Sequence, residues 1–167
     1  KMRYERPELA LAEASIAQFR FRLDRIPPLL ERAEQLLEDS ADPALLGELD
    51  SFKGLFQFWQ GDSRASIRLL EKALSQLPES HVHIVSNTEL MLALARHMEG
   101  QTELAIDRVN ERIHAVDPSE ELFVSYLVGA IVFIRLLAGE LREAKVQALR
   151  MQGVASERVP NCLAWVL

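Results

Sequence analysis

The stretch GLFQFWQGDSRASIRLLEKALSQLP, residues 54–78, holds the pattern that decides the fold. Apolar residues recur at helical spacing on both sides of Gly61-Asp62. This polar, glycine-containing break is of the kind that ends one helix and caps the next. Pro78 then terminates the second helix. The stretch therefore predicts two antiparallel helices joined by a tight turn.

Similar breaks recur along the chain, at Leu23-Asp24-Arg25, Glu99-Gly100-Gln101 and Ala138-Gly139-Glu140. The steps from Asp24 to Gly61, from Gly61 to Gly100 and from Gly100 to Gly139 are 37, 39 and 39 residues. Spacing this regular is typical of a helical-repeat array, in which each helix pair stacks on its neighbours.

We expect a single all-α array. The apolar spacing predicts first helices over about 7–23, 43–60, 83–99 and 119–138, and second helices over about 27–39, 63–77, 102–115 and 141–155. The pairs span about 5–41, 42–80, 81–117 and 118–156, and 160–167 starts a further pair. That start ends in the uncapped apolar string CLAWVL, so we expect the sequence to be a piece of a longer protein.

The composition suits a globular protein, with 49% hydrophobic and 26% charged residues. A net charge of −6 argues against direct contact with nucleic acid, which needs a basic surface. The single cysteine, Cys162, excludes an internal disulfide and a cysteine-based zinc cluster. We find no apolar run long enough for a membrane span and no signal peptide, and we expect a cytoplasmic protein.

Residues 54–78 resemble a tetratricopeptide repeat. Gly54, Ala73 and Pro78 stand where that motif has its close-packing small residues and its terminating proline. The resemblance implies tandem antiparallel helix pairs in a right-handed superhelical solenoid. The repeats here are longer than the usual length of about 34 residues, which implies longer helices.

The third pair keeps most of this pattern but has Arg112 in place of the later alanine. Strings such as FWQGD, SIRLLEKALSQLP and LAGELREA are similar to the superhelical repeat domain of MalT-like, LuxR-family ATP-dependent transcriptional regulators. In that family an NTPase module and a helix-turn-helix flank the repeats, and the repeats bind an inducer or an inhibitory protein. The resemblance thus implies that ATP and DNA are bound by modules outside this segment.

A polar column is predicted on the first helices, four residues before each break. It consists of Arg20, Gln57, Arg96 and Arg135. Two helical turns earlier come Glu13, Asp50 and Glu89. If the column faces a groove, it offers donors to a ligand that carries carboxylate, phosphate or hydroxyl groups, and arginine is the natural fork for such groups.

Two other interpretations of these residues stay open. The column is a solvated stripe, or a ladder of ion pairs between neighbouring repeats that involves Glu13, Asp50 and Glu89 and stabilises little when exposed. Alternatively, the strict tetratricopeptide register buries it, and the groove is then apolar and suits a peptide or helix. The apolar groove would be lined by Phe21, Leu55, Phe58, Leu94, His97 and Phe133.

Other conspicuous side chains favour plain structural roles. Trp59 and Phe58 are expected in the core, and His81 and His83 in a solvated loop, because two histidines alone make a weak metal site. His97 and His114 have no serine, cysteine or paired carboxylate beside them. We therefore predict no catalytic site, no metal site and no enzyme activity.

The resemblance to MalT-like regulators implies a non-enzymatic segment of a transcriptional regulator that binds a small-molecule effector, a regulatory protein or other modules of the same chain. The alternative is a protein interaction scaffold or peptide-binding module of the tetratricopeptide type, with no small-molecule effector. A phosphate-binding loop upstream and a helix-turn-helix downstream would support the regulator, and other neighbours would support the scaffold. A third possibility is a purely structural spacer, which predicts no ligand in the groove.

Overall fold

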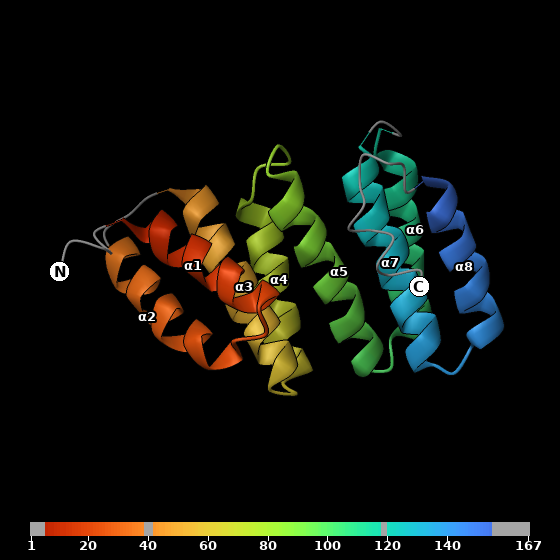
Figure 1. Cartoon of the computed structure of the whole chain (residues 1–167), viewed down its shortest axis with the longest axis horizontal. Helices are drawn as coiled ribbons and strands as arrows, with labels where there is room; N and C mark the ends of the chain where they lie inside the picture. Colours follow the sequence, from red (N-terminus) through yellow and green to blue (C-terminus); the bar gives the residue numbers. More distant parts are fainter. Residues whose placement is uncertain (1–5, 39–41, 118–119, 155–167) are drawn as a thin grey trace. The chain divides into compact units, whose positions relative to one another are not determined.

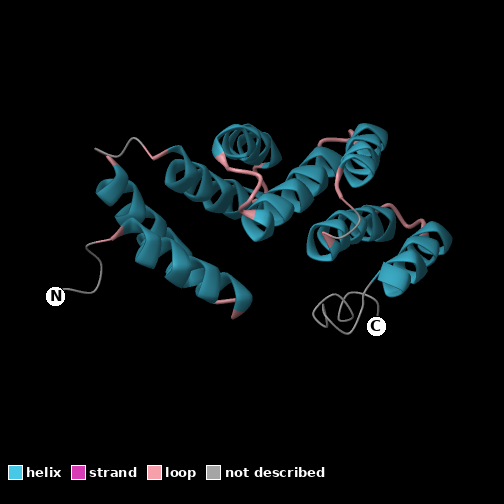
Figure 2. Ribbon diagram, turned by 90° about the horizontal axis from the view of Figure 1, so that it is seen from above, coloured by secondary structure: helices cyan, strands magenta, loops and turns pink. Residues whose placement is uncertain are grey.

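The computed structural model of the chain describes residues 6–38, 42–117 and 120–154. Within these ranges every regular element is helical (Figure 2), so the all-α prediction is confirmed. The α-helices form four successive hairpins and are α1 (Pro7–Phe19), α2 (Ile26–Leu37), α3 (Pro43–Trp59), α4 (Ser63–Gln76), α5 (Val82–Met98), α6 (Thr102–Ala115), α7 (Glu121–Leu137) and α8 (Leu141–Val154). The further pair predicted to start at 160–167 lies outside the described residues.

The helices divide between two compact units, Lys1–Pro78 and Glu79–Leu167. In the first unit α1 packs against α2, α3 packs against α4, and α3 also contacts α1 and α2. In the second unit α7 packs against α5, α6 and α8, and α5 packs against α6 (Figure 1). Within each unit the first helices of the two hairpins are in contact, as expected for stacked helix pairs.

The four hairpin turns share one capping geometry. At the second turn the N–H of Gly61 donates to the carbonyl of Phe58 and the N–H of Asp62 donates to that of Gln57, both at 3.0 Å. This pair of hydrogen bonds to the last turn of the helix is a Schellman motif, which requires a residue in the left-handed conformation. Gly61, Gly100 and Gly139 have φ values of +85°, +77° and +77°. The glycines predicted to mark these turns are therefore confirmed.

The first turn was predicted at the wrong residue. Its left-handed residue is Phe21, with a φ of +52°, rather than Asp24. The N–H groups of Phe21 and Arg22 donate to the carbonyls of Gln18 and Ala17, in the same pattern as at the glycines. The helix ends at Phe19 instead of residue 23, and a 3₁₀ turn (Leu23–Arg25) leads into α2. The step from Phe21 to Gly61 is thus 40 residues.

We expect Phe21→Gly to stabilise the protein by about 1 kcal/mol. A left-handed conformation costs a non-glycine residue about 1–2 kcal/mol, against a smaller entropic cost of glycine. The Phe21 side chain is 80% exposed, so little packing is lost. Urea unfolding followed by circular dichroism measures the change. Gly100→Ala is the matched reverse test: its added Cβ meets no atom within 4 Å, so a loss of stability there reports backbone strain alone.

The second helices bury one stripe, at five, nine, twelve and sixteen residues after the left-handed residue. The stripe is Ile26, Leu30, Ala33 and Leu37 in the first hairpin, and Ser66, Leu70, Ala73 and Leu77 in the second. In the third hairpin Ala105 and Val109 are buried, but the twelfth position is Arg112. This shared stripe supports Phe21 as the equivalent of the three glycines.

Gly54 lies at a close approach of α3 to α4. A Cβ added to it would come within 2.7 Å of Leu70 Cγ, which is closer than packed side chains approach one another. The small residue expected from the tetratricopeptide resemblance therefore has a physical reason, because only glycine fits this crossing.

None of the helices in the described parts of the chain combines the length and the apolar content needed to cross a bilayer.

Candidate functional site

The predicted polar column includes one residue that does not belong to it. Counting four residues back from Phe21 gives Ala17 and not Arg20. Ala17 is buried, whereas Arg20 is exposed at the C-terminal cap of α1. The acidic residue predicted two helical turns earlier is displaced in the same way. The equivalent of Asp50 in the first hairpin is the buried Ala10 instead of Glu13. The column is therefore polar only in the later hairpins.

Asp50 and Glu89 both pair with a cation on the second helix of their own hairpin. Asp50 Oδ2 lies 2.8 Å from Lys72 Nζ, and the Asp50 side chain is only 10% exposed. Glu89 Oε1 lies 3.6 Å from Arg112 Nε. These two carboxylates stand eleven residues before Gly61 and Gly100, so they occupy equivalent places in the repeat. Each ties the middle of a first helix to the end of a second helix.

The cationic members of the column also lie within intramolecular networks. Arg135 pairs with Glu140, which precedes α8, and its Nη1 lies 4.0 Å from Glu103 Oε1 on α6. Arg96 is half-buried and lies close enough to Glu89 to favour its charged form. Gln57 is half-buried on α3. The carboxylates Asp50 and Glu89 pair within their own hairpins, whereas the predicted ladder joined neighbouring repeats. Ligand binding by these residues stays a prediction.

Arg112 is the centre of a cluster that the sequence indicated only as a departure from the repeat pattern. Its Nη2 donates to Glu79 Oε1 at 3.1 Å, and its Nε pairs with Glu89. Its guanidinium lies over the ring of Phe123, 5.3 Å from the centroid, which is a cation–π contact. One side chain from α6 thus joins the segment before α5, the middle of α5 and the start of α7.

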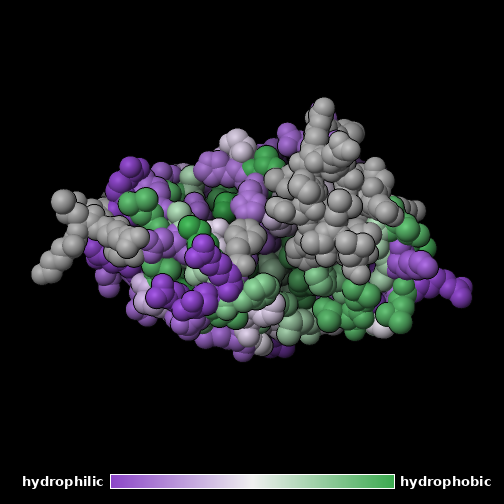
Figure 3. Space-filling view, viewed as in Figure 1, coloured by the Kyte–Doolittle hydropathy of each residue, from purple (hydrophilic) through white to green (hydrophobic). Residues whose placement is uncertain are grey.

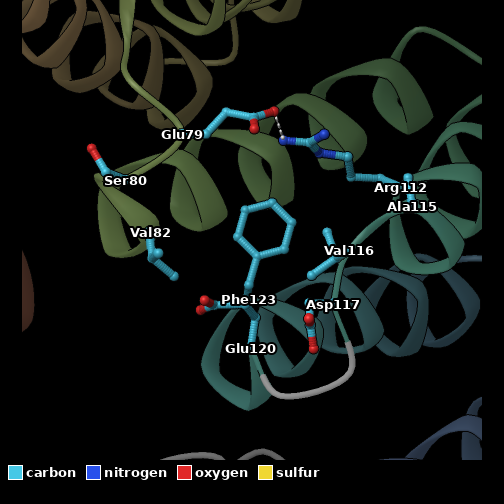
Figure 4. Close-up of a pocket in the computed structure, with 9 residues that line it drawn as sticks. All are labelled: Glu79, Ser80, Val82, Arg112, Ala115, Val116, Asp117, Glu120 and Phe123. Atoms are coloured by element: carbon cyan, nitrogen blue, oxygen red, sulfur yellow. Dashed lines mark hydrogen bonds and ion pairs between the residues drawn. The ribbon is translucent and has the colours of Figure 1, made fainter.

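A cavity of about 390 Å³ opens beside this arginine (Figure 4). It lies where the segment before α5, the end of α6 and the start of α7 meet. The Phe123 ring lies in the middle of the group, with Val82 on one side and Val116 on the other, and with the Arg112–Glu79 pair beyond its far edge. The lining residues are Glu79, Ser80, Val82, Arg112, Ala115, Val116, Asp117, Glu120 and Phe123.

Burial raises the pKa of the Glu89 carboxyl from its usual 4.5, and the charges of Arg112 and Arg96 oppose this shift. The folded protein therefore binds this proton more tightly than the unfolded chain does. The stability gained from that proton is fully present below the unfolded pKa and is lost as the pH rises through the folded pKa.

We expect Glu89→Gln to remove this pH dependence. The free energy of unfolding of the original protein, relative to the variant, should fall as the pH rises above the usual carboxyl pKa of 4.5. Urea unfolding at several pH values on either side of this value measures it. Glu8→Gln is a control of opposite sign, because a backbone hydrogen bond and Arg6 lower the pKa of Glu8. If the original protein instead became more stable relative to Glu89→Gln as the pH rises, the result would contradict the burial of this carboxyl.

The residues of the alternative apolar groove do not share one environment. Phe21 is exposed and Leu55 and Leu94 are buried, whereas Phe58, His97 and Phe133 are half-buried. The expectation that Trp59 belongs to the core is wrong, because its side chain is 55% exposed. Trp59 is the last residue of α3 and stands directly before the hairpin turn.

The solvated loop expected for His81 and His83 is wrong for His83, which is a helical residue. His83 lies in α5, and its ring meets that of Tyr126 edge to face at 5.7 Å. Burial lowers the pKa of His83. His81 is the residue before α5. Among the residues that the structure describes, no group of three histidine, cysteine or acidic side chains is placed to hold a metal ion.

Comparison with curated proteins shows a similarity to the HTH-type transcriptional regulator MalT of Serratia proteamaculans. The two sequences are 30% identical over 115 residues, which is 65% of this chain and 13% of that protein. The chain therefore spans only about an eighth of this relative's length. No family model and no solved structure matches the chain.

Proposed function

We propose, from this similarity to a transcriptional regulator, that the chain is a binding segment of a MalT-like, LuxR-type regulator. It senses an effector or holds a regulatory protein, and it carries out no reaction of its own. ATP and DNA are bound by modules outside the segment, and the whole protein acts in the cytoplasm.

The similarity to MalT is the observation that carries this function, and the hairpin geometry agrees with it. Four hairpins with one capping pattern, at steps of 40, 39 and 39 residues from Phe21 onward, are what a repeat domain requires. We propose that these hairpins form a right-handed superhelix. Stacked hairpins form an extended surface, which is how repeat domains bind their partners.

The test is made on the complete natural protein that contains this segment. Chromatin immunoprecipitation finds where the protein binds DNA, and RNA sequencing finds which transcripts depend on it. We expect occupancy at promoters. We also expect that deleting the segment changes the response of the target transcripts to growth conditions while DNA occupancy persists. A complete protein that occupies no DNA and leaves transcription unchanged would contradict the regulator assignment.

A scaffold without a small-molecule effector is the second candidate, and exposed apolar side chains at the hairpin ends favour it. Trp59, Met98 and Leu137 stand two residues before Gly61, Gly100 and Gly139, and all are at least half exposed. Figure 3 shows apolar surface at the lower right, where the α7–α8 turn lies in the same view. Exposed apolar side chains at a repeated position suit a protein partner. Stable co-purification of another protein through these ends, without DNA occupancy, would favour the scaffold.

A further inference from the structure

The Arg112 cavity arises where the chain departs from its own repeat. The twelfth position after the left-handed residue is Ala33 in the first hairpin and Ala73 in the second, and both are fully buried. In the second hairpin the first helix passes so close that a Cβ on Gly47 would lie 3.2 Å from the Ala73 carbonyl oxygen. The third hairpin has the long side chain of Arg112 at this position, and the cavity lies beside it.

The positive charge of Arg112 is already matched within the protein. Glu79 and Glu89 contact its nitrogen atoms, and Phe123 lies against its guanidinium plane. An anionic ligand would have to displace Glu79 and would then face Asp117 and Glu120, which also line the cavity. The lining of the cavity therefore holds three carboxylates, those of Glu79, Asp117 and Glu120, and one guanidinium. This excess of negative charge favours a cation over an anion.

The remaining wall is apolar and suits an aliphatic stem. Val82, Ala115 and Val116 line the cavity together with the edge of Phe123. The volume of about 390 Å³ lies in the range of small-molecule pockets. A long basic side chain has the matching shape, with an apolar stem and a charged head.

The geometry points to a site for an ammonium or guanidinium group carried on an aliphatic stem. The stem lies along Val82 and Val116, and the charged head lies near Glu120 and Asp117. The ligand is a free aliphatic amine or a lysine or arginine side chain of a partner. This assignment rests on the proposed function of the segment as a binding module, and it names the chemistry that the segment recognises.

Methyl NMR on the whole chain tests the site. The probes are pentylammonium and agmatine as cations and pentanoate as the matched anion. We expect the Val82 and Val116 methyl signals to shift with saturation, with a Kd of about 1 mM or tighter for a cation, and at least about ten-fold weaker binding of pentanoate. Equal or tighter binding of pentanoate, or no saturable shift with either cation, would overturn the site.

Substitutions locate the charge that binds the probe. Glu120→Gln should weaken cation binding at least about five-fold, and Glu120→Lys should abolish it, whereas Glu111→Gln, an exposed carboxylate on α6 outside the cavity, should leave it unchanged. Circular dichroism checks that each variant is folded. If Glu120→Gln binds as tightly as the original chain, the site is wrong.

A second pair of probes separates the two sources of the ligand. The peptides acetyl-Gly-Lys-Gly-amide and its norleucine counterpart differ only in the charged head. Tighter binding of the lysine peptide than of pentylammonium assigns the site to a partner's side chain, and the reverse order assigns it to a free amine. NMR detects binding and not regulation, so the two proposals fail separately. A negative NMR titration would overturn the cation site without affecting the regulator assignment, and a protein that occupies no DNA would overturn the regulator assignment without affecting the cation site.

Discussion

Gly54→Val is expected to lower the free energy of unfolding by about 3 kcal/mol, although valine is intrinsically no worse than glycine in a helix. The new Cβ alone would lie 2.7 Å from Leu70 Cγ and 2.8 Å from Leu70 Cδ2. Leu70 is fully buried, so it has no open space to move into. The two helices must separate, and the packing along the whole α3–α4 crossing weakens.

Urea unfolding of a graded series measures this effect. Gly54→Ala should cost less than Gly54→Val, and Ser75→Val, at an exposed position of α4, should change stability by less than about 1 kcal/mol. Leu70→Ala combined with Gly54→Val should cost less than the sum of the two single changes, because the smaller side chain leaves room for valine. Additive losses would show that the close approach is not the cause.

Ile134→Ala is the second large effect, with an expected loss of about 3 kcal/mol. Ile134 has no exposed surface and lies on α7, the helix that packs against the three others of its unit. Truncating it leaves a cavity that the surrounding helices fill only in part.

Leu137→Ala on the same helix is the matched control. Its side chain is 63% exposed, so the same kind of truncation should cost less than about 0.5 kcal/mol. Both variants are compared by urea unfolding, with the m-value as a check that the unfolded state is unchanged. Similar losses at the two positions would mean that α7 presents a different face to its neighbours.

The sequence predicted the helices well wherever the turn chemistry was local. The second helix of the second hairpin was expected over 63–77 and is Ser63–Gln76. Asp62 explains this agreement, because its Oδ1 accepts from the N–H of Ala65 and thereby caps the helix start. The first turn was placed three residues late because no glycine marks it. Phe21 takes the left-handed conformation, which a phenylalanine in a sequence does not reveal.

The candidate site was predictable only in part, and the error at the first turn had a direct effect on it. Arg20 and Glu13 entered the polar column because they were counted from Asp24, whereas Ala17 and Ala10 occupy those places. The sequence did mark Arg112 as a departure from the alanine of the repeat. It could not show that this arginine meets Glu79 and Phe123, because both contacts form only when α6 packs beside the segment before α5 and the start of α7.

The division of α7 into buried and exposed residues was the least predictable feature of the second unit. Its sequence ELFVSYLVGAIVFIRLL is apolar on all sides, so helical spacing cannot distinguish a covered residue from an exposed one. Only the packing of the neighbouring helices separates Ile134 from Leu136 and Leu137. A helix of this composition needs tertiary structure to assign its surface.

The exposed ammonium group of Lys72 neutralises the buried carboxylate of Asp50. Lys72 is 60% exposed and therefore open to acylating reagents or to enzymatic acetylation, while Asp50 is nearly enclosed. Acetylation would remove the positive charge and leave the carboxylate buried without its counter-ion, which is far more costly than losing an exposed ion pair. Acetylation of this exposed lysine would thus weaken the packing between α3 and α4 in the interior of the hairpin.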